Sequence, residues 1–305
     1  MMVRLPVLTA GLVLALASSS ARAETAAAAS TAKTPPPFTW ADTYEKGRSS
    51  VMGDGRFLLL DFYTDWCGWC KRLDKDVFAK PSFQQAASGV LGVKINAEKR
   101  RDLAQKYAAN RYPRLFFLDS RGRTVEIIRG YIGLAEFTAK VGQVKSGNTE
   151  LSRLETAAGE RGDLGSTMRL ARFLTDTGQL EEGLPHWQMV HDLALEAMFS
   201  NPALEARNSV HHRQALYQLG RAYLAAGLPD ISEQHYVEVI GSYPGSPEAS
   251  ESVFELATRA ATAGDSENLN RFLDQLTDEY RGTPAHRRSG QLRNRLNILT
   301  SKGGP

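Results

Sequence analysis

Apolar positions follow two different patterns along this chain, one typical of a buried strand and one typical of paired helices. Residues 57–63 are almost continuously apolar and have the length of a strand buried in a parallel sheet. Residues 70–78 then place Leu73 and Val77 on one face of a helix. From about Gly147 onward, helix-forming residues are broken by glycine and proline. The pattern predicts an α/β domain followed by an all-α region.

The second half repeats one spacing of apolar and small residues after 37 positions. The matching positions are Leu216, Leu219, Gly220 and Tyr223 in one copy and Val253, Leu256, Ala257 and Ala260 in the next. Turns at Gly227 and Gly264 follow the two copies, and a looser copy lies upstream at Leu170 to Leu174. The spacing predicts helix–turn–helix hairpins in which small residues let paired helices approach closely.

These hairpins resemble tetratricopeptide repeats, because Leu219-Gly220, Tyr223, Tyr236 and Pro244 fall on the spacing of that family. The period is longer than is usual in the family, and a plain helical bundle remains the alternative. The resemblance implies a surface that binds a protein partner.

The N-terminus has the pattern of a secretory signal peptide. Arg4 precedes an apolar run, and Ala21-Arg22-Ala23 supplies small residues for cleavage. The run is shorter than the roughly 20 residues that cross a bilayer, although an uncleaved anchor helix remains open. We therefore expect a signal peptide at 1–23, a flexible linker at 24–37, and a soluble periplasmic protein without stable membrane insertion.

Charge adds little to this description. The 37 basic and 34 acidic residues become 35 and 34 when Arg4 and Arg22 leave with the signal peptide. This balance gives no reason to expect nucleic acid or an anionic membrane as a partner. The remaining length suits two domains, which we place at 38–146 and 147–305.

The chain contains two cysteines, Cys67 and Cys70, at the predicted turn from strand to helix. A structural disulfide would close too small a loop to stabilise the fold much, and zinc would need further ligands that the distant histidines do not supply. A helix N-terminus stabilises a thiolate, and Gly68 allows a close approach. We expect Cys67 to be the exposed nucleophile and Cys70 the shielded resolving thiol, with no metal and no cofactor.

Residues 38–144 resemble a thioredoxin fold, with Asp61 before the C-x-x-C pair, Lys94 on a strand, and Tyr112-Pro113 before another strand. The resemblance implies a hairpin formed by 115–119 and 124–128, and a closing helix at 133–144. It also implies that Asp61 accepts a proton from Cys70, that Lys94 approaches Asp61, and that Pro113 is cis. The alternatives are a structural ion pair, a solvated lysine and a trans proline.

The closest resemblance is to the secreted thioredoxin-like domain at the C-terminus of membrane thiol:disulfide interchange reductases. It is carried by the W-C-x-x-C-K motif, by Asp76-Val77-Phe78 and by Arg129-Gly130-Tyr131. Trp69 and Tyr112 depart from the usual thioredoxin residues at their positions. We expect Trp66 to be packed and Trp69 to be exposed. The resemblance implies a substrate surface made of Trp66, Gly68, Trp69, Tyr112 and Pro113.

Three functions follow from these residues. The first is reduction of protein disulfides by exchange through Cys67 and Cys70, recharged by a membrane thiol:disulfide reductase, with a client or partner on the repeats. The second is the reverse flow of electrons, in an oxidase or isomerase. The third is a repeat scaffold that uses the first domain for docking without catalysis.

Overall fold

The computed structural model describes residues 35–200 and 202–302. The expected signal peptide, together with residues 24–34 of the expected linker, lies outside the described residues. Within the two described ranges, no helix combines the length and the hydropathy that crossing a membrane requires.

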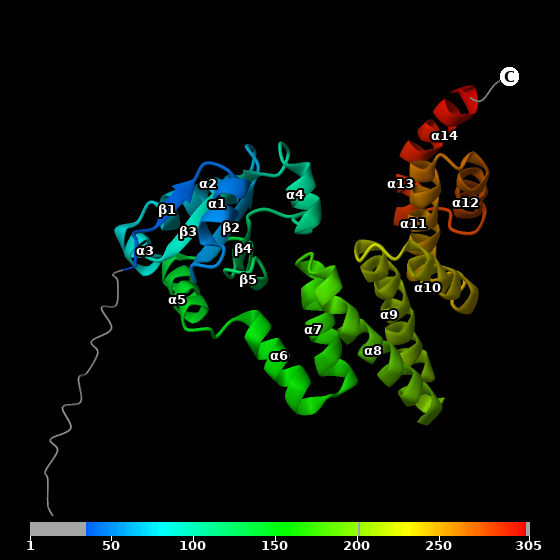
Figure 1. The fold of residues 1–305 in the computed structure, drawn as a ribbon, viewed down its shortest axis with the longest axis horizontal. Helices are drawn as coiled ribbons and strands as arrows, with labels where there is room; N and C mark the ends of the chain where they lie inside the picture. Colours follow the sequence, from blue (N-terminus) through cyan, green and yellow to red (C-terminus); the bar gives the residue numbers. More distant parts are fainter. Residues whose placement is uncertain (1–34, 201, 303–305) are drawn as a thin grey trace, which may run out of the picture. The chain divides into compact units, whose positions relative to one another are not determined.

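A five-stranded mixed sheet forms the centre of the first half (Figure 1). The strand order is β1-β3-β2-β4-β5, with β1, β3 and β2 parallel and β4 and β5 antiparallel to their neighbours. The strands are β1 (Thr39–Ala41), β2 (Phe57–Tyr63), β3 (Val90–Asn96), β4 (Arg114–Leu118) and β5 (Thr124–Arg129). The prediction of a buried strand at 57–63 is confirmed, because β2 is the central strand and is covered on both faces.

Short helices flank this sheet. They are α1 (Tyr44–Val51), α2 (Gly68–Leu73), the π-helical η1 (Asp74–Phe78), α3 (Pro81–Ala86), α4 (Arg101–Lys106) and α5 (Leu134–Lys145). The helix predicted at 70–78 therefore begins at Gly68 and changes to π geometry at Asp74. The amide of Ala79 donates to the carbonyl of Asp74, five residues earlier, which widens this turn.

Aromatic side chains fill the core between the sheet and these helices. Phe78 and Phe83 meet Phe137 of α5 edge to face, with ring centroids 5.5 and 5.4 Å apart. In a separate contact, the rings of Phe62 on β2 and Phe116 on β4 also meet edge to face, with centroids 5.5 Å apart. Edge-to-face contacts add to the free energy gained by removing these large apolar surfaces from water. This packing holds the turn between β2 and α2 on a rigid base.

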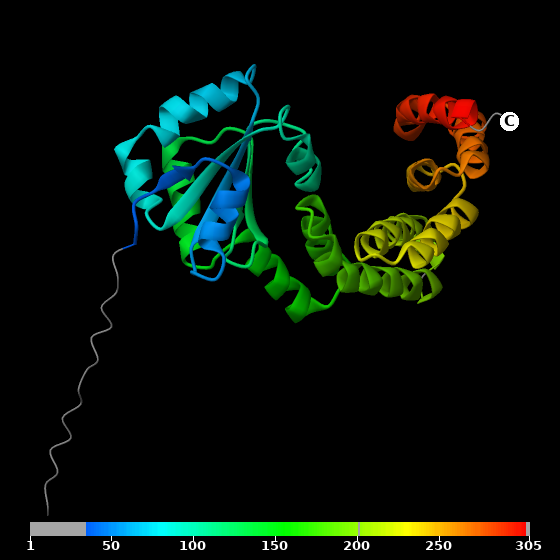
Figure 2. The same ribbon diagram turned by 45° about the horizontal axis from the view of Figure 1, so that its top comes forward.

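The second half of the described chain is rich in helices, as the repeated spacing predicts (Figures 1 and 2). The helices are α6 (Glu150–Arg161), α7 (Leu164–Asp176), α8 (Leu180–Ser200), η2 (Pro202–Leu204), α9 (Glu205–Ala225), α10 (Pro229–Ser242), α11 (Pro247–Ala263), α12 (Ser266–Asp278), α13 (Pro284–Arg288) and α14 (Gly290–Lys302). Helix α9 packs against both α8 and α10.

Small residues allow these helix pairs to approach closely, as expected. A Cβ atom built on Gly220 of α9 would lie 2.5 Å from Cε1 of Tyr236 on α10. Tyr236 is fully buried over this glycine. Gly264 ends α11 with a φ of 75°, a left-handed conformation that glycine adopts without strain.

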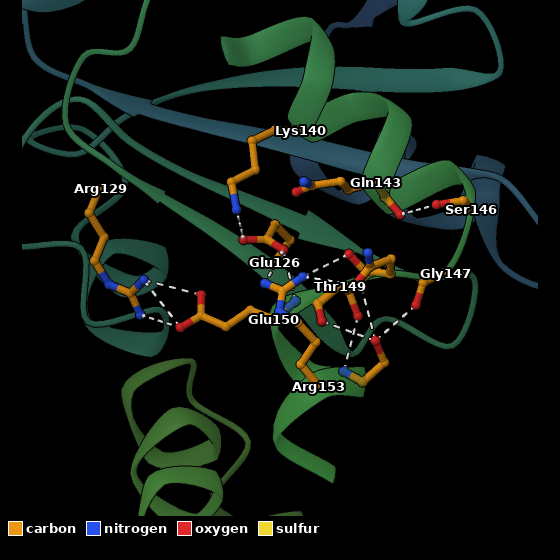
Figure 3. A network of polar contacts seen from close by, with 11 residues as sticks. Glu126, Arg129, Lys140, Gln143, Ser146, Gly147, Thr149, Glu150 and Arg153 are labelled. Carbon is orange, nitrogen blue, oxygen red and sulfur yellow. Dashed lines mark hydrogen bonds and ion pairs between the residues drawn. The ribbon is translucent and has the colours of Figure 1, made fainter. Parts of the chain in front are cut away.

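A buried carboxylate ties the first helix of the second half to the sheet (Figure 3). Glu126 of β5 accepts hydrogen bonds from Nζ of Lys140 at 3.1 Å and from the backbone amide of Glu150 at 2.8 Å. Arg153 of α6 lies 3.7 Å from the same carboxylate. Apolar side chains of α6 and α7, including Leu151 and Phe173, also join the core cluster of the sheet. The junction between the two halves is therefore packed.

Candidate active site

Cys67 and Cys70 form a disulfide bond at the turn between β2 and α2. Cys67 is the N-cap of α2, and its Sγ accepts a hydrogen bond from the backbone amide of Cys70 at 3.1 Å. The first amides of a helix have no partner within the helix, so one of them here contacts sulfur. The same amide would stabilise a thiolate at Cys67 in the reduced protein.

In this disulfide-bonded form, the two cysteines have nearly the same exposed fraction. Cys67 is 4% exposed and Cys70 is 5% exposed, so the expectation of an exposed Cys67 is wrong for this state. The sulfur of Cys67 lies against the first turn of α2, where it is bonded to Cys70 and accepts a hydrogen bond from the amide of Cys70. The residues between the pair are open to solvent instead.

Asp61 is buried on the central strand, where its neighbours across the sheet are Lys94 of β3 and Leu115 of β4. Its Oδ2 accepts a hydrogen bond from Nζ of Lys94 at 3.0 Å. Its Oδ1 is buried without a hydrogen-bond partner among the described residues. Burial raises the pKa of Asp61, and the positive charge of Lys94 offsets only part of that effect. A buried carboxylate with a raised pKa is suited to accept a proton during a reaction.

Lys94 contacts a second carboxylate, that of Asp74 at the start of η1. Its ammonium group also lies 5.2 Å from the ring centroids of Trp40 and Phe78. Burial opposes the charge, but Asp61 and Asp74 outweigh it and raise the pKa of Lys94. The charged lysine therefore bridges one buried carboxylate and one that is open to solvent.

Sequence reasoning did not single out Asp74 as a residue of the site. A usable signal was present, because Asp74 lies four residues after Cys70 and therefore on the same side of a helix.

Tyr112 and Pro113 precede β4, and the peptide bond between them is cis. The hydroxyl of Tyr112 donates to the carbonyl of Ala109 at 3.0 Å, and its ring meets that of Trp66 edge to face at 6.2 Å. A cavity of about 240 Å³ is lined by Arg111, Tyr112, Pro113, Arg114, Arg129 and Gly130. The segment before β4 thus combines aromatic, proline and arginine surfaces.

Both tryptophans beside the cysteines face solvent. Trp69 is 55% exposed, in line with expectation, and shares the guanidinium of Arg72 with the ring of Tyr131. Trp66 is 70% exposed, so the expectation that it is packed is wrong. Its indole N–H donates to Glu98 at 3.0 Å, which holds the ring at the surface rather than in the core.

Gly68 lies between the two tryptophans in sequence. A Cβ atom built on it would meet no heavy atom within 4 Å, so no close approach inside this chain requires a glycine there. The space above Gly68 is open for a substrate.

Comparisons with known proteins agree with this geometry. Residues 44–145 match the family model described as a thioredoxin-like domain. Over 89 residues, the chain is 33% identical to protein disulfide isomerase-like 2-2 of Oryza sativa subsp. japonica. The aligned segment covers 29% of this chain and 24% of that protein. Over 97 residues, it is 31% identical to thiol:disulfide interchange protein DsbD 2 of Pseudomonas aeruginosa, which covers 30% of this chain and 16% of that protein.

A solved structure is similar over the same half. It is the C-terminal domain of DsbD from Neisseria meningitidis in its oxidised form, with a TM-score of 0.29 and 22% identity, covering 32% of this chain and 90% of that one. The chain spans about a quarter or less of the length of the two curated relatives named above. The family match confirms the resemblance expected from the sequence and ends before α6.

Proposed function

We propose that the thioredoxin-like domain formed by residues 44–145 is a thiol–disulfide oxidoreductase that reduces disulfide bonds in protein substrates. The observation that carries the proposal is the Cys67–Cys70 disulfide at the N-terminus of α2. There the backbone amide of Cys70 donates a hydrogen bond to the sulfur of Cys67. This arrangement favours the thiolate, which is the attacking species in disulfide exchange.

The reduced protein acts in two exchanges. The Cys67 thiolate attacks one sulfur of a substrate disulfide, a mixed disulfide forms, and the other substrate sulfur leaves as a thiolate that takes up a proton. Cys70 then loses its proton and attacks the sulfur of Cys67, which releases the second substrate sulfur. The Cys67–Cys70 bond has formed, and two electrons have passed from the protein to the substrate.

Asp61 accepts the proton of Cys70 in this proposal. Its raised pKa and its unpartnered oxygen suit a group that gains and loses a proton during turnover. Lys94 acts as a positioning residue, because its contact with Asp74 keeps the ammonium group in place whether or not Asp61 is charged.

Substrate would bind over Trp66, Gly68, Trp69, Tyr112 and Pro113. Exposed aromatic rings supply most of the binding free energy at many protein interfaces, and both tryptophans are exposed here. Arginines beside Pro113 would favour substrates with acidic residues next to the cysteine.

The electrons would come from a dithiol donor, which we propose to be a membrane thiol:disulfide reductase. This choice rests on the similarity to an interchange protein and on the expected export of the chain to the periplasm, a compartment that is kept oxidising. A donor is required because each turnover leaves the Cys67–Cys70 pair oxidised.

The helices from α6 onward would bind a client or partner protein in the manner of tetratricopeptide repeats. A cavity of about 480 Å³ supports this role, and it is lined by side chains from α7, α8, α9 and α11, among them Arg172, Trp187, Tyr217 and Glu251. We place the two domains at 38–146 and 147–305.

Measuring the reduction potential of the Cys67–Cys70 pair tests the direction of electron flow. A reductase should have a potential near that of thioredoxin, about −270 mV, and should reduce insulin when a chemical dithiol supplies electrons. A potential near about −120 mV would favour an oxidase or isomerase instead. A pair that exchanges with neither insulin nor glutathione would favour a scaffold without catalysis.

A further inference from the structure

We propose that the helical region carries a divalent transition-metal site, formed by His191, His212 and Glu238, that is separate from the thiol pair. Each of these residues offers one ligand atom, and the three atoms lie within 4.8 Å of one another. Two imidazoles with one carboxylate form a ligand set that suits Zn²⁺ or Co²⁺.

Three consecutive long helices bring these residues together. His191 lies on α8, His212 on α9 and Glu238 on α10. Because α9 packs against both α8 and α10, its buried face lies between the other two helices. The two imidazole rings are adjacent, with centroids 4.7 Å apart and planes tilted by 39°.

His212 supplies the strongest reason to expect a ligand. The residue is only 5% exposed, and its Nε2 is buried without a hydrogen-bond partner among the described residues. A buried polar atom without a partner destabilises a fold by about 1–3 kcal/mol. A metal ion would satisfy this nitrogen.

Tyr243 orients the His212 ring. Its hydroxyl oxygen lies 2.6 Å from Nδ1 of His212. When Nδ1–H donates to this oxygen, Nε2 carries the free lone pair that a metal needs.

His191 shows the same arrangement. Its Nδ1 lies 3.0 Å from a carboxylate oxygen of Asp192, which leaves Nε2 available. A metal-binding histidine commonly donates its other ring N–H to a carboxylate or another oxygen, which fixes the tautomer. Both histidines therefore have the outer partner that metal ligands usually have.

Glu238 supplies the negative charge and lies on the open side of the cluster. Ligand atoms around a tetrahedral zinc lie about 3.3 Å apart, given bonds of about 2.0 Å. Closing the cluster from 4.8 Å requires side-chain rotation, and the exposed Glu238 is free to make it. An ion can enter from solvent along this side.

The alternative is a pair of histidines that only fill space between helices. Nδ1 of His211 and Nδ1 of His235 are also buried without a hydrogen-bond partner among the described residues, and His235 stacks on the ring of Tyr223 at 5.3 Å. His212 differs from these two because its ligand atom lies within 4.8 Å of those of a second histidine and a carboxylate. A metal ion would give its Nε2 a partner, whereas filling space between helices would not.

Co²⁺ titration of the untagged chain, with Cys67 and Cys70 held as the disulfide, tests the proposal without interference from the thiols. We expect one Co²⁺ to bind per chain and to give a visible absorption band characteristic of a low coordination number. Zn²⁺ should displace it. Glu238→Gln and His191→Gln should each weaken Co²⁺ binding at least about tenfold. His211→Gln is the matched control, because it changes the adjacent histidine on α9 and should leave binding unchanged.

Tyr243→Phe should weaken Co²⁺ binding by about 10-fold to 100-fold while leaving the three ligands in place. Glu238 is exposed, so its variant should fold normally even if a change at His212 does not. The proposal is overturned if the wild-type chain binds no Co²⁺. It is equally overturned if Glu238→Gln and His191→Gln bind Co²⁺ as tightly as His211→Gln does.

Discussion

The ammonium group of Lys94 lies 3.0 Å from the buried carboxylate of Asp61 and also contacts the carboxylate of Asp74. One lysine thus pairs with a carboxylate on the central strand and with another at the solvent boundary. Because Asp74 alone can keep Lys94 paired, Asp61 is free to change its protonation state without leaving Lys94 unpartnered.

Asp61→Asn should slow disulfide reduction and leave the fold as stable as before, or more stable. General-base catalysis typically contributes about 100-fold or more, and we expect a loss of at least about tenfold in the step that resolves the mixed disulfide. Removing a buried charge also removes its desolvation cost. Stopped-flow measurement of the release of a reduced substrate, with thermal unfolding in parallel, checks both parts.

The effect of Asp61→Asn on stability should depend on pH. The pKa of Asp61 is raised in the folded protein, so the folded state holds this proton more tightly than the unfolded state does. The associated stability is present at low pH and is lost as pH rises from 3.8 through the raised pKa. Asparagine does not ionise, so the variant does not lose this stability as pH rises. The difference in unfolding free energy between the variant and wild type should therefore grow from acid toward neutral pH in denaturant titrations.

Asp74→Asn is the control for this pair. It removes the outer partner of Lys94 and keeps the buried acid, so it should slow resolution much less than Asp61→Asn does. Equal rates for wild type and Asp61→Asn, with a less stable variant, would make Asp61 a structural ion-pair partner only.

Much of the fold could be predicted because local patterns and packing agree. The near-continuous apolar run at 57–63 has one stable location, the centre of a covered sheet, and β2 lies there. The helical spacing around Gly220 likewise allows only one buried face, and the side chain of Tyr236 covers it.

The site was harder to predict, because its details depend on contacts between distant segments. Trp66 is at the surface because Glu98, 32 positions later, accepts its N–H. Cys67 is buried in the disulfide-bonded form, in which its sulfur is joined to Cys70. The cluster of His191, His212 and Glu238 forms only when three helices pack together, and no short sequence motif indicates it.

Cys70→Ser should trap mixed disulfides between Cys67 and substrate proteins, whereas Cys67→Ser should trap none. The nucleophile is assigned to Cys67 because it is the N-cap of α2 and contacts the amide of Cys70. Non-reducing gels of the two variants, incubated with a disulfide-containing protein, give the comparison. Trapping by both variants to the same extent would contradict the assignment.

Alkylation gives a second measure of the same asymmetry. In the reduced wild-type chain, iodoacetamide at mildly acidic pH should modify Cys67 at least about tenfold faster than Cys70, because only the thiolate reacts. Peptide mass analysis separates the two sites. A faster reaction at Cys70 would reverse the roles of the two thiols.

Trp69→Ala should raise KM for a protein disulfide by about tenfold and leave the reaction with a small disulfide nearly unchanged. Trp69 is exposed, and its contacts with Arg72 and Tyr131 hold the ring in place at the surface. Phe199→Ala on α8 removes another exposed aromatic ring and serves as the control. Parallel losses on both substrates would point to damage at the thiols rather than to lost docking.

Gly220→Ala should destabilise the helical region, whereas Gly241→Ala should stabilise it. Both glycines lie in helices of the same packed pair, α9 and α10, so alanine improves helix propensity at each by roughly 0.5–1 kcal/mol. The new methyl group at Gly220 would lie 2.5 Å from Cε1 of the fully buried Tyr236, and such overpacking typically costs about 1–3 kcal/mol. A methyl group at Gly241 meets no heavy atom within 4 Å.

The two substitutions therefore separate helix propensity from close packing within one helix pair. Urea unfolding followed by circular dichroism should show opposite shifts of the transition midpoint, with similar slopes for the two variants. Tyr236→Leu in the Gly220→Ala background removes the ring that the methyl group would contact, so it should restore part of the lost stability. If Gly220→Ala is as stable as Gly241→Ala, then α9 and α10 do not pack closely at Gly220, and the repeat-like pairing of these helices loses its main support.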